Sequence, residues 1–307
     1  MSTDPPSLLV VVAGPTAVGK TSLSIRLARH FSTAIISADS RQFYREMRIG
    51  TARPSAEEMK SVPHYFIGHL SIHEPYDIAR FETDALDILE QLFLDHRVVI
   101  MTGGSGLYIH AVIHGVDDLP DPDPAIRQTL ESLYHQKGIN ALRAKLKLLD
   151  PVYYDEADIS NPRRLLRALE VCMSAGIPYS SLRRKMPKQR NFSILRIGLS
   201  RERAELNRRI DARVDRMMAE GLPDEARRLL PFRHLNALNT VGYKEIFEYL
   251  EGRISLEEAA GLIKKNTRHY AKRQMTWFRK DPQYRWFHPD QGDEILEYIE
   301  MNRMTGP

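Results

Sequence analysis

The stretch VVVAGPTAVGKTSLSIRLA, residues Val10 to Ala28, decides the fold. A β-branched apolar run turns at Gly14 and leads into a segment with apolar residues at helical spacing. Residues 14 to 21 fit the pattern G-x-x-x-x-G-K-[ST], with the strand before it and the helix after it that a P-loop requires. Such a loop surrounds phosphate with backbone amides at a helix N-terminus. The predicted diphosphate-binding residues are Gly14, Pro15, Thr16, Ala17, Val18, Gly19, Lys20 and Thr21, with Thr21 as a magnesium ligand.

Further short apolar runs at residues 34–37, 98–102 and 193–200 predict more strands, separated by helical patterns. Continuous apolar strands alternating with helices are typical of a parallel sheet covered on both faces, which binds ligands at the carboxyl ends of its strands. We therefore predict an α/β protein with a P-loop NTPase-like core. The loops that follow the first three strands should converge.

The proline-rich segment DDLPDPDPAIR, residues 117–127, interrupts this pattern, and the chain then reads as helical to about residue 190. We predict three parts: the first part of the core at residues 1–120, an inserted all-helical domain at 121–190, and a return to the core with C-terminal helices at 191–307. The chain from Pro223 onward is predicted to be helical.

Composition limits the setting in which the protein works. The 307 residues carry a formal net charge of +4 and one cysteine, so an internal disulfide and a zinc site built from cysteines are excluded. The apolar run at residues 8–13 is too short for a signal peptide or a membrane span. We expect a cytoplasmic protein, and nothing demands more than a monomer.

Two loops at predicted strand ends carry candidate chemistry. Asp39, in ADSRQFY, follows the second strand and suits a general base or the surroundings of magnesium, or simply caps the next helix or turn. The loop TGGSGLY lacks side chains around Ser105, which favours close approach to a flat substrate or a tight turn. The strand before Ser105 ends without the carboxylate typical of nucleotide hydrolases, so the P-loop does not imply hydrolysis.

Basic residues gather in two helical segments. In NPRRLLRALEV, Asn161 and Pro162 begin a helix that places Arg163 and Arg167 one turn apart, suited to phosphate or to a solvated face. Residues 261–285 contain eight basic residues and only one acidic residue. At helical spacing, aromatic residues of this segment fall on a different stripe of the helix from the basic ones. Such a helix is either a solvated basic face with an aromatic core side or a polyanion-binding surface.

Six segments in this order, GPTAVGKT, ADSRQFY with IGTARP, GGSGLY, NPRRLLRALEV, VGYKE and AKRQMTWFRK, closely resemble the bacterial tRNA dimethylallyltransferases. The resemblance runs from about residue 8 to about residue 287. It implies transfer of a dimethylallyl group from dimethylallyl diphosphate to N6 of adenine 37 of tRNA, with Mg²⁺ as cofactor. Ser105 stands where many relatives carry threonine, and the chain lacks the zinc finger of eukaryotic members.

The resemblance also implies residue roles. Asp39 corresponds to the carboxylate that bonds the adenine amine, and Thr16 and Arg213 to diphosphate-contacting catalytic residues. The glycine loop around Ser105 and the insertion would receive the flipped base. The implied tRNA-binding residues are Asp39, Ser40, Arg41, Gln42, Ser105, Arg127, Arg163, Arg164, Arg167, Gly242, Tyr243, Lys244, Lys272, Arg273, Gln274 and Arg279.

Three other functions are consistent with parts of the sequence. A small-molecule or nucleotide kinase would use the insertion as a lid over ATP, but it leaves the basic aromatic C-terminal helix without a role. An adenylate isopentenyltransferase would need no tRNA-sized basic surface. An RNA-binding module with a degenerate P-loop is at odds with the intact Gly19, Lys20 and Thr21.

Overall fold

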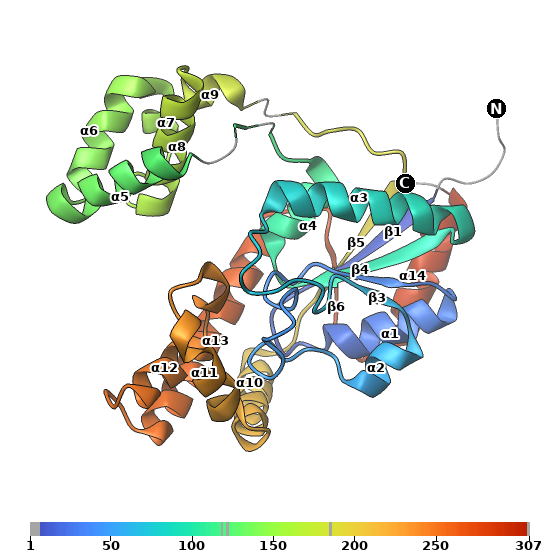
Figure 1. Cartoon of the computed structure of the whole chain (residues 1–307). Coiled ribbons are helices and arrows are strands. Elements are labelled where there is room, and N and C mark those ends of the chain that lie inside the picture. Colours follow the sequence, from blue (N-terminus) through green and yellow to red (C-terminus); the bar gives the residue numbers. More distant parts are fainter. Residues whose placement is uncertain (1–6, 118, 121–122, 184–185, 306–307) are drawn as a thin grey trace. The chain divides into compact units, whose positions relative to one another are not determined.

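The computed structural model describes residues 7–117, 119–120, 123–183 and 186–305 (Figure 1). Two compact units make up the chain. The first contains residues 1–114 and 189–307, and the second contains residues 115–188, close to the insertion predicted at 121–190.

The first unit is built on a parallel six-stranded sheet with strand order β3-β2-β4-β1-β5-β6. The strands are β1 (Leu8–Ala13), β2 (Ile35–Ser37), β3 (His64–Tyr65), β4 (Val98–Gly103), β5 (Ser193–Leu199) and β6 (Arg285–Phe287). The predicted α/β fold with a parallel sheet is confirmed. The prediction that the chain is helical from Pro223 onward is wrong for β6, because a three-residue strand is too short to show a period of two.

Helices surround this sheet in the first unit. Before the insertion they are α1 (Lys20–His30), α2 (Ala56–Ser61), α3 (Ile78–Asp95) and α4 (Gly106–His114). After it they are α10 (Arg203–Ala219), α11 (Leu222–Leu229), α12 (Tyr243–Leu250), α13 (Leu256–Phe278) and α14 (Gly292–Thr305), with 3₁₀ turns at Leu230–Phe232 and Asn236–Leu238. No helix among the described residues is long and apolar enough to cross a membrane.

Alternation along β1 shows how the sheet divides the core. Leu9, Val11 and Ala13 are buried in a cluster with residues of α3, α4, α12 and α13. Leu8, Val10 and Val12 are buried in a second cluster with residues of α1, α10 and α14. Side chains of a strand point alternately to opposite faces, so a strand buried on both faces is apolar throughout.

The second unit has its own small core. Its helices are α5 (Pro124–Lys137), α6 (Ile139–Leu149), α7 (Pro151–Glu156), α8 (Pro162–Ala175) and α9 (Tyr179–Leu182). Leucines of α5, α6 and α8 form the centre, including the fully buried Leu130, Leu142 and Leu169. The side chain of Asn161 accepts a hydrogen bond from the Arg163 amide at the start of α8, as predicted for the cap.

Candidate active site

The parallel register places the ends of three strands side by side. Ala13 of β1 pairs with Gly103 of β4, and Ser37 of β2 pairs with Thr102 of β4. The P-loop, the Asp39 loop and the glycine loop therefore leave the sheet at the same edge. The predicted convergence of these three loops is confirmed.

The P-loop has a backbone shape that few residues adopt. Gly14, Ala17 and Gly19 have φ values of 153°, 63° and 116°. A non-glycine residue at positive φ, such as Ala17, is uncommon and often marks a functional site. Lys20 begins α1, and its Nζ donates hydrogen bonds to the carbonyls of Gly14 (3.0 Å) and Pro15 (2.8 Å).

Burial and two neighbouring charges act on the pKa of Lys20. Burial lowers the pKa of Lys20 to about 8, while the Asp39 carboxylate acts in the opposite direction and Arg213 lowers the pKa further. Burial and the charge of Arg209 lower the pKa of Arg213, and the Asp39 carboxylate acts in the opposite direction. An anion bound near Lys20 would favour the protonated lysine.

Three arginines contact the P-loop from outside its own sequence. Arg213 Nη1 donates to Thr16 Oγ1 at 3.1 Å, which brings together the predicted Thr16 and Arg213. Arg209 Nε donates to the Ala17 carbonyl, and Arg201 Nε donates to the Val18 carbonyl, both at 2.9 Å. Sequence reasoning missed Arg201 and Arg209, although the spacing of Arg209 and Arg213 by four residues on a helix was a usable signal.

Asp39 follows β2 after one residue and begins a turn, so its carboxylate caps that turn and does not cap a helix. Its Oδ1 accepts a hydrogen bond from the Arg41 amide at 3.1 Å. The neighbouring Ser40 amide donates to Ser105 Oγ at 3.0 Å, so the Asp39 loop and the glycine loop are joined. Burial and the charge of Asp39 raise the pKa of Tyr270, whose hydroxyl interacts with Ser105.

Protein packing explains the glycines of the glycine loop. A Cβ on Gly103 would collide with the Ala38 backbone, and one on Gly106 would collide with Trp277. A Cβ on Gly104 would meet the amide of Gln274. The glycines make room for neighbouring parts of the chain. Their presence therefore requires neither the flat substrate nor the tight turn that the sequence suggested.

Gln274 of α13 bridges two of the loops. Its Oε1 accepts from the Thr16 amide at 2.9 Å, and its Nε2 donates to the Gly104 carbonyl at 2.9 Å. The side chain is only 5% exposed. Its position therefore fits a bridge between the P-loop and the glycine loop and does not fit the predicted contact with tRNA.

Tyr243 also differs from its predicted role. Its side chain is fully buried, and its hydroxyl donates to Glu225 at 2.6 Å. The same carboxylate accepts from the amides of Arg48, Ile49 and Gly50 at 3.1, 2.9 and 2.9 Å. Tyr243 thus holds the loop that follows Asp39, and its side chain is not available to tRNA.

The other predicted tRNA residues of the first unit divide into two groups. Arg41 Nη1 donates to the carbonyls of Asn236 and Ala237, and Gln42 Nε2 donates to those of Thr51 and Ala52, so both brace loops. Gly242 is buried at the start of α12 with a φ of 100°. The exposed basic side chains are Lys244, Lys272, Arg273 and Arg279.

In the second unit, two of the four predicted arginines are engaged within that unit. Arg127 and Arg167 both pair with the buried Glu170, at 3.5 and 3.1 Å. Arg163 and Arg164 are exposed at the start of α8. Of the two arginines predicted to bind phosphate together, Arg163 is therefore exposed and Arg167 is paired with Glu170.

Comparisons with known proteins agree on one family. The family described as IPP transferase matches residues 42–281. The chain is 51% identical over 297 residues to tRNA dimethylallyltransferase 1 of Bacteroides thetaiotaomicron, covering 97% of this chain and 96% of that protein. It is 52% identical over 292 residues to the Bacteroides fragilis protein of the same name, covering 95% and 97%.

Solved structures are similar over most of the chain. The tRNA isopentenylpyrophosphate transferase of Bacillus halodurans superposes with a TM-score of 0.71 at 38% identity, covering 97% of each chain. A eukaryotic dimethylallyltransferase, solved in the course of acting on tRNA, gives a TM-score of 0.75 at 27% identity, covering 88% of this chain and 69% of that chain.

Proposed function

The chain belongs to the IPP transferase family, and on that premise we propose that its P-loop holds the diphosphate of dimethylallyl diphosphate while Asp39 receives N6 of adenine 37. The chain is a transferase that moves a prenyl group to tRNA, as its relatives' names state. The products are N6-dimethylallyladenosine in the tRNA and free diphosphate.

The observation that carries this proposal is the meeting of a phosphate-binding loop and a carboxylate in one site. Asp39 lies close enough to Lys20 and Arg213 for its charge to act on the pKa of both, against the lowering by burial. A P-loop beside an acceptor carboxylate suits displacement of a diphosphate by a nucleophile. The kinase alternative does not account for the basic surface of α13.

The chemistry balances with these groups. N6 of adenine forms a bond to the allylic carbon, and the bond from that carbon to the diphosphate oxygen breaks, with its electrons leaving on the diphosphate. Lys20, Arg213 and the Thr16 hydroxyl stabilise the growing negative charge. Asp39 orients the amine and accepts its proton, which helps because the N6 lone pair is delocalised into the ring.

Magnesium is the cofactor that we propose. Thr21 lies in the first turn of α1 beside Lys20, and its hydroxyl oxygen suits a hard cation that takes its other ligands from diphosphate and water. No cluster of three or more His, Cys, Asp or Glu able to hold a metal occurs in the described part of the chain. Bound there, magnesium would neutralise charge on the diphosphate.

The proposed tRNA surface consists of exposed cations. Lys272 and Arg273 on α13, Arg279 at its C-cap and Lys244 at the start of α12 would bind the phosphates of the anticodon stem-loop. Arg163 and Arg164 of the second unit would add backbone contacts. We propose that the enzyme acts in the cytoplasm as a monomer.

Transfer of label tests the proposal. Purified protein, magnesium and radiolabelled dimethylallyl diphosphate are incubated with an unmodified anticodon stem-loop carrying A36-A37-A38, and with the same RNA carrying G37. We expect label on the A37 RNA alone, and none after chelation of magnesium. Equal labelling of both RNAs, or phosphorylation of small molecules by ATP in place of prenyl transfer, would overturn the proposal.

A further inference from the structure

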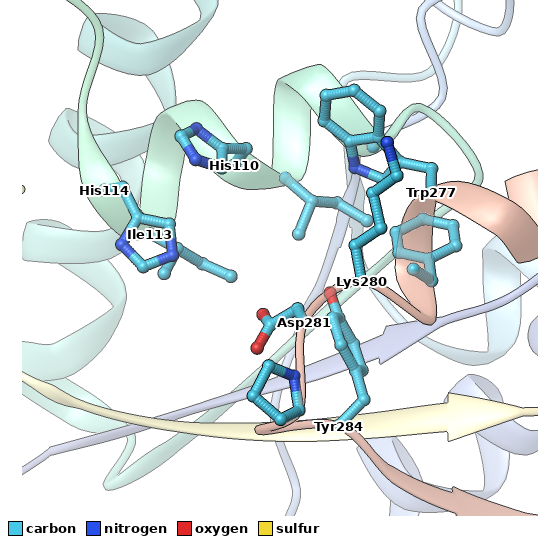
Figure 2. Close-up of a pocket in the computed structure, with 11 residues that line it drawn as sticks. His110, Ile113, His114, Trp277, Lys280, Asp281 and Tyr284 are labelled. Carbon is cyan, nitrogen blue, oxygen red and sulfur yellow. The ribbon is translucent and has the colours of Figure 1, made fainter. Parts of the chain in front are cut away.

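A cavity of about 380 Å³ lies between α4 and the C-terminal end of α13, within the first unit (Figure 2). We refer to it as the α4–α13 pocket. Its volume falls in the range of about 300–1,000 Å³ typical of small-molecule sites. It is lined by Gly106, Ile109, His110, Ile113, His114, Trp277, Phe278, Lys280, Asp281, Pro282 and Tyr284.

The walls of the α4–α13 pocket suit a flat, polar ring. Ile109, Ile113 and Phe278 are buried and make apolar surface. Trp277 keeps 39% of its surface exposed, which makes it one of the few large exposed hydrophobic residues. An accessible indole is the kind of surface on which unstacked nucleobases stack.

Hydrogen bonds from neighbouring residues fix the Asp281 carboxylate of the α4–α13 pocket. Arg196 of β5 is 8% exposed and its Nη1 lies 3.2 and 3.4 Å from the two oxygens of Asp281. The Gln283 amide also donates to Asp281 Oδ1, at 2.9 Å. Each carboxylate oxygen has two lone pairs, so Asp281 Oδ2 can accept a further hydrogen bond. Figure 2 shows His110 and His114 across the cavity from Asp281.

The α4–α13 pocket adjoins the acceptor side of the active site. Gly106, which lines it, directly follows Ser105, whose hydroxyl binds the loop of Asp39. Trp277, packed against Gly106, is three residues after Gln274, which bonds Gly104. An RNA loop that presents one base at Ser105 thus brings the neighbouring nucleotides to this pocket.

We propose that the α4–α13 pocket receives the base of a nucleotide next to the reactive adenine in the substrate RNA. The base stacks on Trp277, its exocyclic amine donates to Asp281, and Lys280 binds the adjoining phosphate. Adenine, cytosine and guanine carry an exocyclic amine and uracil does not, so the pocket discriminates against uracil. This inference rests on the proposed function and adds a specificity-determining site to it.

Abasic substitution in the RNA tests the inference. Stem-loops lacking the base on the 5′ or the 3′ side of the reactive adenine are compared with the intact stem-loop, using wild-type protein, Trp277→Ala and Trp277→Phe. With wild type, one abasic site should lower kcat/KM on the order of tenfold, the size of a lost stacking contact. Trp277→Phe should keep that penalty. Trp277→Ala should act poorly on intact RNA and lose the difference between intact and abasic RNA.

Controls separate the possible failures. Leu94→Ala removes another exposed apolar side chain, on α3, and should keep the wild-type pattern. A penalty that is equal in wild type and Trp277→Ala, or absent at both positions while transfer is robust, overturns the pocket and leaves the proposed function intact. No transfer to intact RNA by wild type would instead overturn the proposed function.

A free nucleotide has the same chemistry as an RNA base, so its binding is measured separately. Calorimetric titration of the protein with AMP in the absence of RNA should show no saturable binding that depends on Trp277. Saturable, Trp277-dependent binding of AMP together with a flat abasic scan would assign the pocket to a free mononucleotide and overturn the RNA source.

Discussion

Gln274 offers a sharp prediction because it touches two loops of the active site and is buried. Replacing it by alanine removes the acceptor of the Thr16 amide and the donor to the Gly104 carbonyl. Each bond between neutral groups contributes about 0.5–1.5 kcal/mol net, so the two together contribute about 1–3 kcal/mol. That range corresponds to about 5- to 150-fold in the population of the aligned arrangement.

The loss should fall on the chemical step. Gln274 bonds protein backbone at both ends, so its removal should loosen the alignment of the P-loop with the glycine loop and leave the groups proposed to contact each substrate in place. We expect the single-turnover rate of prenyl transfer in Gln274→Ala to fall by about 5- to 150-fold, with a much smaller change in the Kd for dimethylallyl diphosphate.

Rapid-quench assays with excess enzyme measure the transfer rate, and urea unfolding measures stability. Gln91→Ala, which removes an exposed glutamine from α3, is the matched control and should behave as wild type. A Gln274→Ala protein that is destabilised but transfers at the wild-type rate would refute the bridging role and leave Gln274 as a core residue only.

Three further predictions concern the same site. On the proposal that the protonated Lys20 binds diphosphate, its pKa of about 8 implies that KM for dimethylallyl diphosphate should rise about tenfold from pH 7 to pH 9. Initial rates measure this, and a flat profile contradicts it. Thr16→Ala and Arg213→Lys should each lower kcat about 10²-fold. Because the two side chains act through one contact, the loss of kcat in the double variant should be smaller than the product of the two single losses. Additive losses in a double-mutant cycle speak against a shared role. Tyr243→Phe should lower the free energy of unfolding by about 1.5–3 kcal/mol, since it removes a bond to the Glu225 carboxylate, and leave KM for tRNA unchanged; a raised KM would restore Tyr243 as a tRNA contact.

Local signals in the sequence were enough to predict the core of the fold. Gly14 and Gly19, at their P-loop spacing, were enough to predict the conformation of the loop. The apolar runs that begin β1 and β4 are typical of strands in a sheet covered on both faces. The convergence of the three loops followed from the parallel arrangement. The strands β3 and β6 were missed because two or three residues carry no periodic pattern.

Contacts distant in the chain could not be predicted. Gln274 and Thr16 are separated by 258 residues, and in the sequence Gln274 looks like any polar residue of a basic helix. The hydrogen bond from the Thr16 amide to its side chain is therefore visible only in the structure. Tyr243 likewise lies in a segment that resembles tRNA-contacting stretches, and only its burial against Glu225 shows its structural role. A resemblance assigns function to segments, whereas burial decides which side chains of a segment are available.

The central claim is that Asp39 takes the proton of the attacking amine while the P-loop holds the diphosphate. Its most direct test is the single-turnover rate of prenyl transfer by Asp39→Asn, near pH 7 so that Lys20 stays protonated, with Asp87→Asn of α3 as the exposed control. We expect a fall of about 10²- to 10⁴-fold with dimethylallyl diphosphate still bound. Transfer by Asp39→Asn at close to the wild-type rate would contradict it.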